Sequence, residues 1–122
     1  MKKCNIELGG KKISLNVVFD CYDDEPITDK QQESLELFEE SKCFIDAIET
    51  PLVRYIKNAS GKTVLESELV KYISPKCLYV CRENNNRKIA ILCDSTFDEE
   101  HGIAIVFTNE KCTGIVGQDE IL

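Results

Sequence analysis

The alternation of apolar and polar residues at the start of the chain predicts a β-hairpin. Apolar or alternating segments occupy residues 6–8 and 13–19, and the run Gly9-Gly10-Lys11-Lys12 separates them. Two strand-like segments around a glycine pair are typical of antiparallel strands joined by a tight turn. An acidic stretch follows and ends at Pro26, which cannot donate a ladder hydrogen bond, so we expect a loop there.

The middle of the chain has the spacing of a helix. Phe38, Ile45 and Leu52 recur every seven residues, and other apolar residues flank them. This pattern predicts an apolar helical stripe from about residue 29 to 57. Thr28, with an acidic residue directly after it, suits the start of that helix.

Pro51 interrupts the stripe and leaves two alternatives open. Either Thr50 caps a second helix with Pro51 at its first position, or one long helix kinks at Pro51. Gly61 is the expected helix stop. A short helix is then predicted over residues 66–73, ended by Ser74-Pro75.

The last third of the chain reads as a series of strands. Residues 77–81 and 89–93 are predicted strands around an asparagine turn at 84–86, and residues 103–107 and 112–116 form a further hairpin. These later strands are apolar at both alternating sets of positions. The sheet should therefore be covered on both faces or paired with another subunit.

The order of these elements predicts one α+β domain over residues 1–122. Its parts are an N-terminal β-hairpin, a central helical segment (one kinked helix or two helices, plus a short helix) and a C-terminal antiparallel β-meander. The length of 122 residues suits a single domain. No apolar run approaches the roughly 20 residues that span a bilayer, and no apolar segment follows the basic start as in a signal peptide. We expect a cytoplasmic protein that does not enter membranes.

Charge is distributed unevenly along the chain, whose net charge is −7. Residues 20–49 hold eleven acidic and two basic side chains, whereas residues 50–92 hold eight basic and three acidic ones. A broad basic face for nucleic acid is therefore not expected. A basic protein partner fits this charge better.

Helical spacing places acidic residues on one face of the predicted helix. Asp29, Glu33, Glu36 and Glu40 follow one another at i, i+4, i+7 and i+11 without a lysine four residues after any of them. Such like-charge pairs cost a helix a few tenths of a kcal/mol each. The face is either plainly solvated or a docking surface for a basic partner. The candidate partner-binding residues are Asp23, Asp24, Glu25, Glu33, Glu36 and Glu40.

Candidate chemistry is limited to one histidine and seven cysteines. His101 follows three acidic residues, so it could act in acid–base catalysis, but the preferred interpretation is that Asp98–Gly102 forms a turn. The odd number of cysteines and the absence of a Cys-x-x-Cys pair indicate reduced thiols that mostly serve as small core residues. We expect no cofactor and no bound metal.

The C-terminal end carries a recognisable series of motifs. In order they are Glu100-His101-Gly102, the strand 103–107, the hairpin 109–114 and Gly117-Gln118-Asp119. This series resembles the end of a family of small bacterial proteins of unknown function (DUF type). Two positions depart from the family pattern: Phe97 stands where a larger aromatic such as Trp is expected, and Asn109-Glu110 where the hairpin usually has Asn-Gly.

The family that the chain resembles has no established enzymatic activity whose residues could be carried over to this sequence. Some members of such families are candidate immunity proteins encoded beside polymorphic toxins, so the resemblance implies a neutralising binder. Our leading hypothesis is a small acidic protein-binding module, of immunity type, that neutralises a basic toxin. The alternatives are a hydrolase or metal-dependent enzyme centred on His101, and a structural homo-oligomer that covers the doubly apolar sheet.

Overall fold

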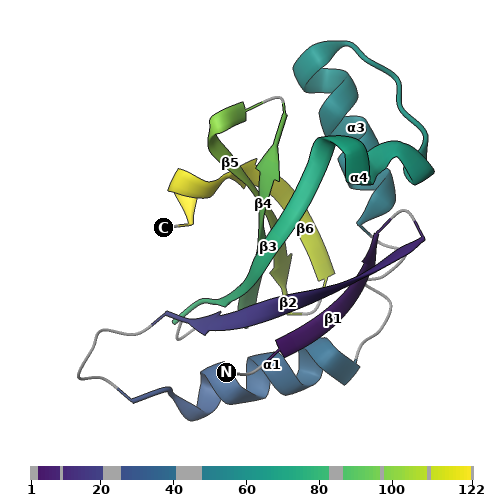
Figure 1. Ribbon diagram of the computed structural model, residues 1–122. Helices are drawn as coiled ribbons and strands as arrows, with labels where there is room; N and C mark the ends of the chain where they lie inside the picture. Colours follow the sequence, from purple (N-terminus) through teal and green to yellow (C-terminus); the bar gives the residue numbers. More distant parts are fainter. Residues whose placement is uncertain are drawn as a thin grey trace.

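The protein is described here from a computed structural model covering residues 3–8, 10–20, 26–40, 48–82, 87–96, 98–109 and 111–121. For Asp98, Glu99 and His101 only the backbone is described. One mixed six-stranded sheet has the strand order β1-β2-β3-β4-β5-β6 (Figure 1). Its strands are β1 (Lys3–Leu8), β2 (Lys11–Phe19), β3 (Ile73–Val80), β4 (Lys88–Ser95), β5 (Asp98–Thr108) and β6 (Lys111–Gly117). The helical elements are α1 (Asp29–Glu40), α3 (Glu49–Ser60), η1 (Glu66–Glu68), α4 (Leu69–Tyr72) and η2 (Gln118–Glu120).

The topology confirms the predicted α+β class. Strands β1 and β2 form the N-terminal hairpin, and β3 to β6 form the C-terminal antiparallel meander. Only the β2–β3 pair is parallel. The connection between these two strands holds α1, α3 and α4, as a parallel pair requires a long crossover.

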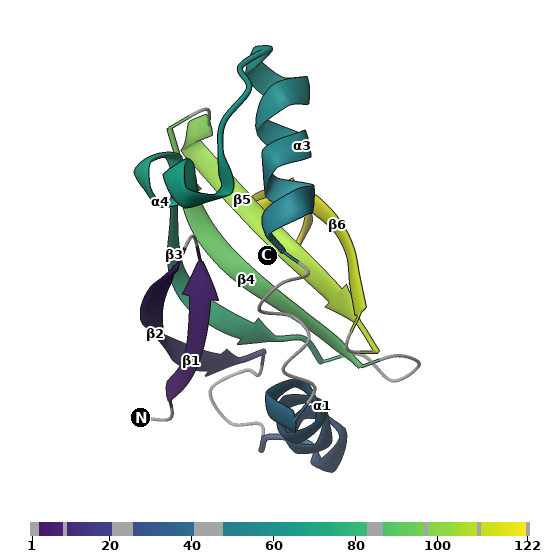
Figure 2. The ribbon, with the colours of Figure 1, turned by 90° about the vertical axis from the view of Figure 1, so that its right-hand side faces the viewer.

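The helices cover one face of the sheet, which we call the core face. Leu35 and Phe38 of α1 and Leu52 of α3 are fully buried there with the inward side chains of the strands. The Phe38 ring meets the Phe107 ring of β5 edge-on, with ring centroids 5.0 Å apart. Helices α1 and α3 lie at opposite ends of the sheet (Figures 1 and 2).

Helix α3 resolves the alternatives at Pro51. The helix begins at Glu49, with Ile48 at the N-cap, so a separate helix starts close to Pro51 rather than one long helix kinking there. Thr50, the cap that the first alternative named, is already helical, and Ile48 takes the N-cap position. Pro51 lies in the first turn, where its missing N–H would have no partner in the helix. Gly61 ends α3 as predicted, with φ of 75° and its N–H bonded to the Lys57 carbonyl.

Two predicted boundaries are wrong. Ser74-Pro75 does not end the short helix, since β3 already begins at Ile73. Pro75 is tolerated in this strand because β3 pairs with β2 only from Cys77 onward. The segment Asp98–Gly102 is not a turn before a strand but the first part of β5 itself. The loops predicted at 21–25 and 84–86 lie outside the described residues.

The start of α1 is fixed by the buried side chain of Gln31. Thr28 and Gln31 form a capping box: the Thr28 hydroxyl accepts the Gln31 N–H at 3.1 Å, and the Gln31 amide oxygen accepts the Thr28 N–H at 3.0 Å. The Gln31 amide nitrogen donates to the carbonyl of Asp20 at 2.9 Å and, more weakly, to that of Val80 at 3.4 Å. One side chain thus joins α1 to the ends of β2 and β3.

Replacing Gln31 tests whether its hydrogen bonds hold α1 against the ends of β2 and β3. Gln31 is 1% exposed, so Gln31→Ala should leave the Asp20 carbonyl without this donor, remove half of the capping box and destabilise the protein by about 2 kcal/mol. Urea unfolding followed by circular dichroism measures the change. The control is Gln32→Ala in the same turn, which is exposed and should change stability by less than about 0.5 kcal/mol. Equal effects at the two positions would contradict the role given to Gln31.

Candidate functional site

The acidic side chains predicted on one helix face do lie together on α1. Glu33, Glu36 and Glu40 are all exposed, as is Asp29 before them. The buried residues of α1 (Gln31, Ser34, Leu35 and Phe38) occupy the opposite side of the helix. At about 1.5 Å of rise per residue, the four acidic positions extend over roughly 16 Å. We call these four residues the acidic row. The other candidates, Asp23, Asp24 and Glu25, lie outside the described residues.

Within the described ranges of the chain, no ion pair joins a carboxylate of the acidic row to a base. The charges of the acidic row also destabilise helix α1. Asp29 faces Glu33, and Glu36 faces Glu40, at the i, i+4 spacing at which like charges repel. The last turn of α1 ends in Glu39 and Glu40 with no base, although the helix dipole favours a cation there. Folding alone therefore gives no reason for this charge pattern.

Basic side chains lie at the other end of the molecule. Arg54 and Lys57 on α3, Lys62 after it and Lys71 on α4 are exposed. The Lys62 ammonium also stands 4.9 Å from the centre of the Tyr72 ring. Helices α1 and α3 lie at opposite ends of the sheet (Figure 1), so the basic side chains of α3 lie away from the acidic row, although Glu66 on η1 is also exposed.

The C-terminal signature residues meet at an irregular point of the sheet. Cys93 pairs with Ile103 and Ser95 pairs with Asp98, so one residue of β4 lies opposite four of β5. Gly102 lies in this bulge with φ of 70°. A Cβ at Gly102 would come within 2.7 Å of the Cys93 carbonyl and 2.5 Å of the Gln118 amide nitrogen. Glycine is therefore required there both for its φ and for the close approach.

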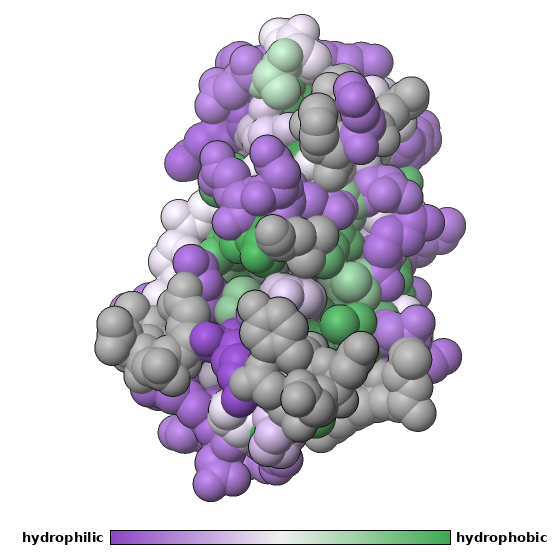
Figure 3. Space-filling model, turned by 90° about the vertical axis from the view of Figure 1, so that its left-hand side faces the viewer, coloured by the Kyte–Doolittle hydropathy of each residue, from purple (hydrophilic) through white to green (hydrophobic). Residues whose placement is uncertain are grey.

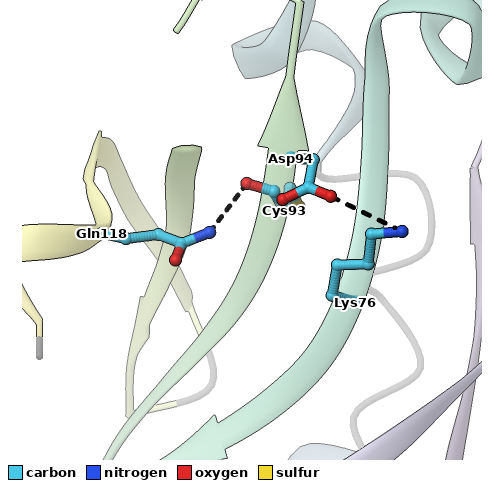
Figure 4. Close-up of polar contacts among 4 residues, drawn as sticks. All are labelled: Lys76, Cys93, Asp94 and Gln118. Carbon is cyan, nitrogen blue, oxygen red and sulfur yellow. Dashed lines mark hydrogen bonds and ion pairs between the residues drawn. The ribbon is translucent and has the colours of Figure 1, made fainter. Parts of the chain in front are cut away.

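Gln118 closes the bulge from the C-terminal end. Its amide nitrogen donates to the Cys93 carbonyl at 2.9 Å (Figure 4). Asp119 is exposed, and its carboxylate lies so close to Gly117 that a Cβ there would collide with it. Gly102 and Gln118 thus have a structural explanation in which no chemistry is needed.

The remaining signature residues, Glu100 and His101, do not form a described catalytic site together with Gly102 and Gln118. Glu100 is exposed on β5, while His101 belongs to β5 by its backbone and its side chain lies outside the described part. An enzyme centred on His101 therefore stays a hypothesis that the structure does not test. Among the side chains that are described, no three His, Cys, Asp or Glu residues lie close enough to hold a metal ion.

Four of the described cysteines, Cys4, Cys77, Cys93 and Cys112, lie in or beside apolar clusters. Cys4 and Cys93 are buried in the core, and Cys112 packs against it. Burial strongly raises the pKa of the Cys93 thiol, with smaller contributions from nearby Cys77 and Asp94. Burial also raises the pKa of the Cys77 and Cys112 thiols. Since the thiolate is the nucleophile, these three residues are poor candidates for catalysis.

Comparison with known proteins identifies the family. A family model described as Domain of unknown function (DUF6985) matches residues 1–122, and the chain therefore belongs to this family. No curated protein and no solved structure matches the chain. Within the described ranges, no helix has both the length and the apolar character needed to span a membrane.

Substitution of Gly102 tests the structural explanation of the signature. Gly102→Ala should destabilise the protein by about 2–4 kcal/mol, because it adds both backbone strain and a collision with the Cys93 carbonyl. The matched control is Gly61→Ala, whose φ of 75° is similar but whose Cβ would meet open space, so it should cost only about 1 kcal/mol. Gln118→Ala in the Gly102→Ala background should not restore stability. Thermal and urea unfolding measure all three, and an equal loss at both glycines would refute the close-approach argument.

Proposed function

We propose that this member of the DUF6985 family is a small protein-binding module that docks a basic protein through the acidic row of α1. The observation that carries the proposal is that four exposed carboxylates share one helix face at a cost to the helix. Solubility alone would be served by mixed signs on that face. Stability given up at an exposed surface is typical of residues kept for function.

The rigid mounting of α1 supports this proposal. The capping box and the Gln31 amide fix the start of the helix, and Phe38 packs on Phe107 near its end. A row held in place before binding loses little freedom when a partner docks. The charges would also speed the encounter with a basic partner and make it sensitive to salt.

The more specific proposal is an immunity-type protein of a bacterial cytoplasm that neutralises a basic toxin by occluding it. The C-terminal motifs that resemble families with candidate immunity members support it, as does the acidic surface. Asp23, Asp24 and Glu25 precede α1 directly in the sequence and would add to its charge. A toxin gene directly upstream in the source genome would support this proposal.

Charge reversal of the acidic row tests the docking surface. The triple variant Glu33→Lys, Glu36→Lys and Glu40→Lys should fold about as stably as the natural chain, because it turns the Asp29–Glu33 contact into an opposite-charge pair and places a base in the last turn, while positions 36 and 40 still carry like charges. It should bind a lysine-rich helical peptide at least tenfold more weakly at about 50 mM salt, and the difference should shrink near 0.5 M salt. Calorimetric titration measures the affinity for the peptide, and urea unfolding measures the stability of the variant.

The control variant has the same net charge as the triple variant, but its three substitutions lie outside α1. Glu7→Lys, Glu66→Lys and Glu120→Lys change three acidic residues on β1, η1 and η2 by the same amount. This variant should retain most of the affinity for the peptide. Equal weakening in both triple variants would show that net charge, rather than the acidic row, attracts the peptide. A pull-down from the native host with both variants then tests the natural partner.

A further inference from the structure

The face of the sheet turned away from α1, α3 and α4, which we call the outer face, is closed in its middle by the chain itself. Ala90, Leu92, Ala104 and Val106 are 0–7% exposed there, and Ile121, which follows η2, packs against them. Figure 3 shows apolar residues in the middle of this side of the molecule, with hydrophilic residues around them. The cover provided by η2 and Ile121 ends beside β6, and a small cavity lies at this margin.

The cavity has a volume of about 230 Å³ and lies where η2 meets the outer side of the last strands. Val116 and Ile121 form an apolar wall. Lys88 from β4, Thr108 from β5 and Glu120 from η2 bring polar side chains to the same cavity. An apolar wall with a few polar groups beside it is typical of a site for a small molecule.

Gly114 keeps this cavity open. It lies inside β6 opposite Val106 of β5, on the outer side of the sheet. A Cβ at Gly114 would meet no atom within 4 Å, and Gly114 has no positive φ, so neither space nor backbone conformation requires glycine there. The bulge at Thr113 beside it does not require glycine either, for the same reason. Glycine inside a strand weakens the strand and is typical of places that a ligand approaches closely.

Two threonine hydroxyls give the cavity a hydrogen-bond acceptor. The Thr108 and Thr113 oxygens are 3.2 Å apart, and the Thr113 hydroxyl also donates to the Val106 carbonyl at 3.4 Å. A hydroxyl has one proton, so Thr108 donates to Thr113 and its own oxygen keeps lone pairs for another donor. The exposed carboxylate of Glu120 is a second acceptor at the cavity.

The size and chemistry of the cavity indicate its ligand. A volume of about 230 Å³ is smaller than the roughly 300 Å³ at which sites for drug-sized molecules begin, so the ligand is small. The two acceptors suit an ammonium group, and the Lys88 ammonium, a donor, suits a carboxylate. The space over Gly114 and the apolar wall suit an aliphatic side chain. An aliphatic amino acid in its zwitterionic form carries these three groups on one carbon atom.

We infer that the cavity binds a free aliphatic amino acid. Its ammonium group would contact Glu120 and Thr108, its carboxylate would contact Lys88, and its side chain would lie over Gly114 against Val116. The inference goes beyond the proposed function, because α1 packs on the core face and the residues that line the cavity do not include the acidic row.

Titration of the isotope-labelled chain with L-leucine, followed by NMR, tests the site. The amide signals of residues 113–116 and 118–121 should shift and saturate by about 10 mM, since a ligand of this size binds with modest affinity. N-acetyl-L-leucine lacks the ammonium charge and L-leucinamide lacks the carboxylate, so each should bind at least tenfold more weakly. Absence of saturable shifts with L-leucine, or equal binding of either blocked form, would overturn the inference.

Variants of the cavity provide a second test. Gly114→Val fills the cavity with a side chain that suits a strand, so it should abolish the leucine-induced shifts while the melting temperature stays equal or rises. Glu120→Gln should weaken leucine binding at least tenfold. The matched control Asp119→Asn removes the same charge in the same turn but outside the cavity, and it should bind leucine like the natural chain. Unchanged binding in Gly114→Val, or equal weakening at positions 119 and 120, would contradict the proposed site.

Discussion

The position of α1 depends on the buried amide of Gln31. This side chain accepts from the cap of its own helix and donates to the carbonyls at the ends of β2 and β3. Because the residue is 1% exposed, water cannot easily replace these partners if one is lost. The same helix presents the acidic row on its other side. A polar contact in the interior therefore sets where the surface charges lie.

A second constraint acts at the far end of the sheet. The bulge in β5 needs a residue that tolerates positive φ and leaves space for the Cys93 carbonyl, and Gly102 meets both needs. Gln118 then supplies the donor for that carbonyl. A motif that combines acidic residues, a histidine and a glycine resembles a catalytic corner. In this fold its glycine, together with the glutamine of the closing motif, serves to join β4, β5 and the C-terminal end.

Periodicity made the sheet and the acidic row predictable from the sequence. Residue spacing alone locates the hairpins and the exposed side of α1, because period 2 and period 3.6 are local properties. The errors arose where distant contacts decide. Pro75 continues a strand because β2 is absent beside it. The segment Asp98–Gly102 belongs to β5, with Asp98 paired to Ser95 of β4 and a bulge after it, although it reads as a turn. The capping box Thr28-x-x-Gln31 was visible in the sequence, but the carbonyls that the amide binds are set by the fold.

The acidic row and the buried amide that positions it respond differently to the solvent. The acidic row attracts a basic partner over a long range and loses this attraction in salt, because exposed charges are screened. The Gln31 side chain is 1% exposed, so its hydrogen bonds to the ends of β2 and β3 are shielded from the ions of the solvent. Salt therefore weakens the attraction of the row while α1 keeps its place on the sheet.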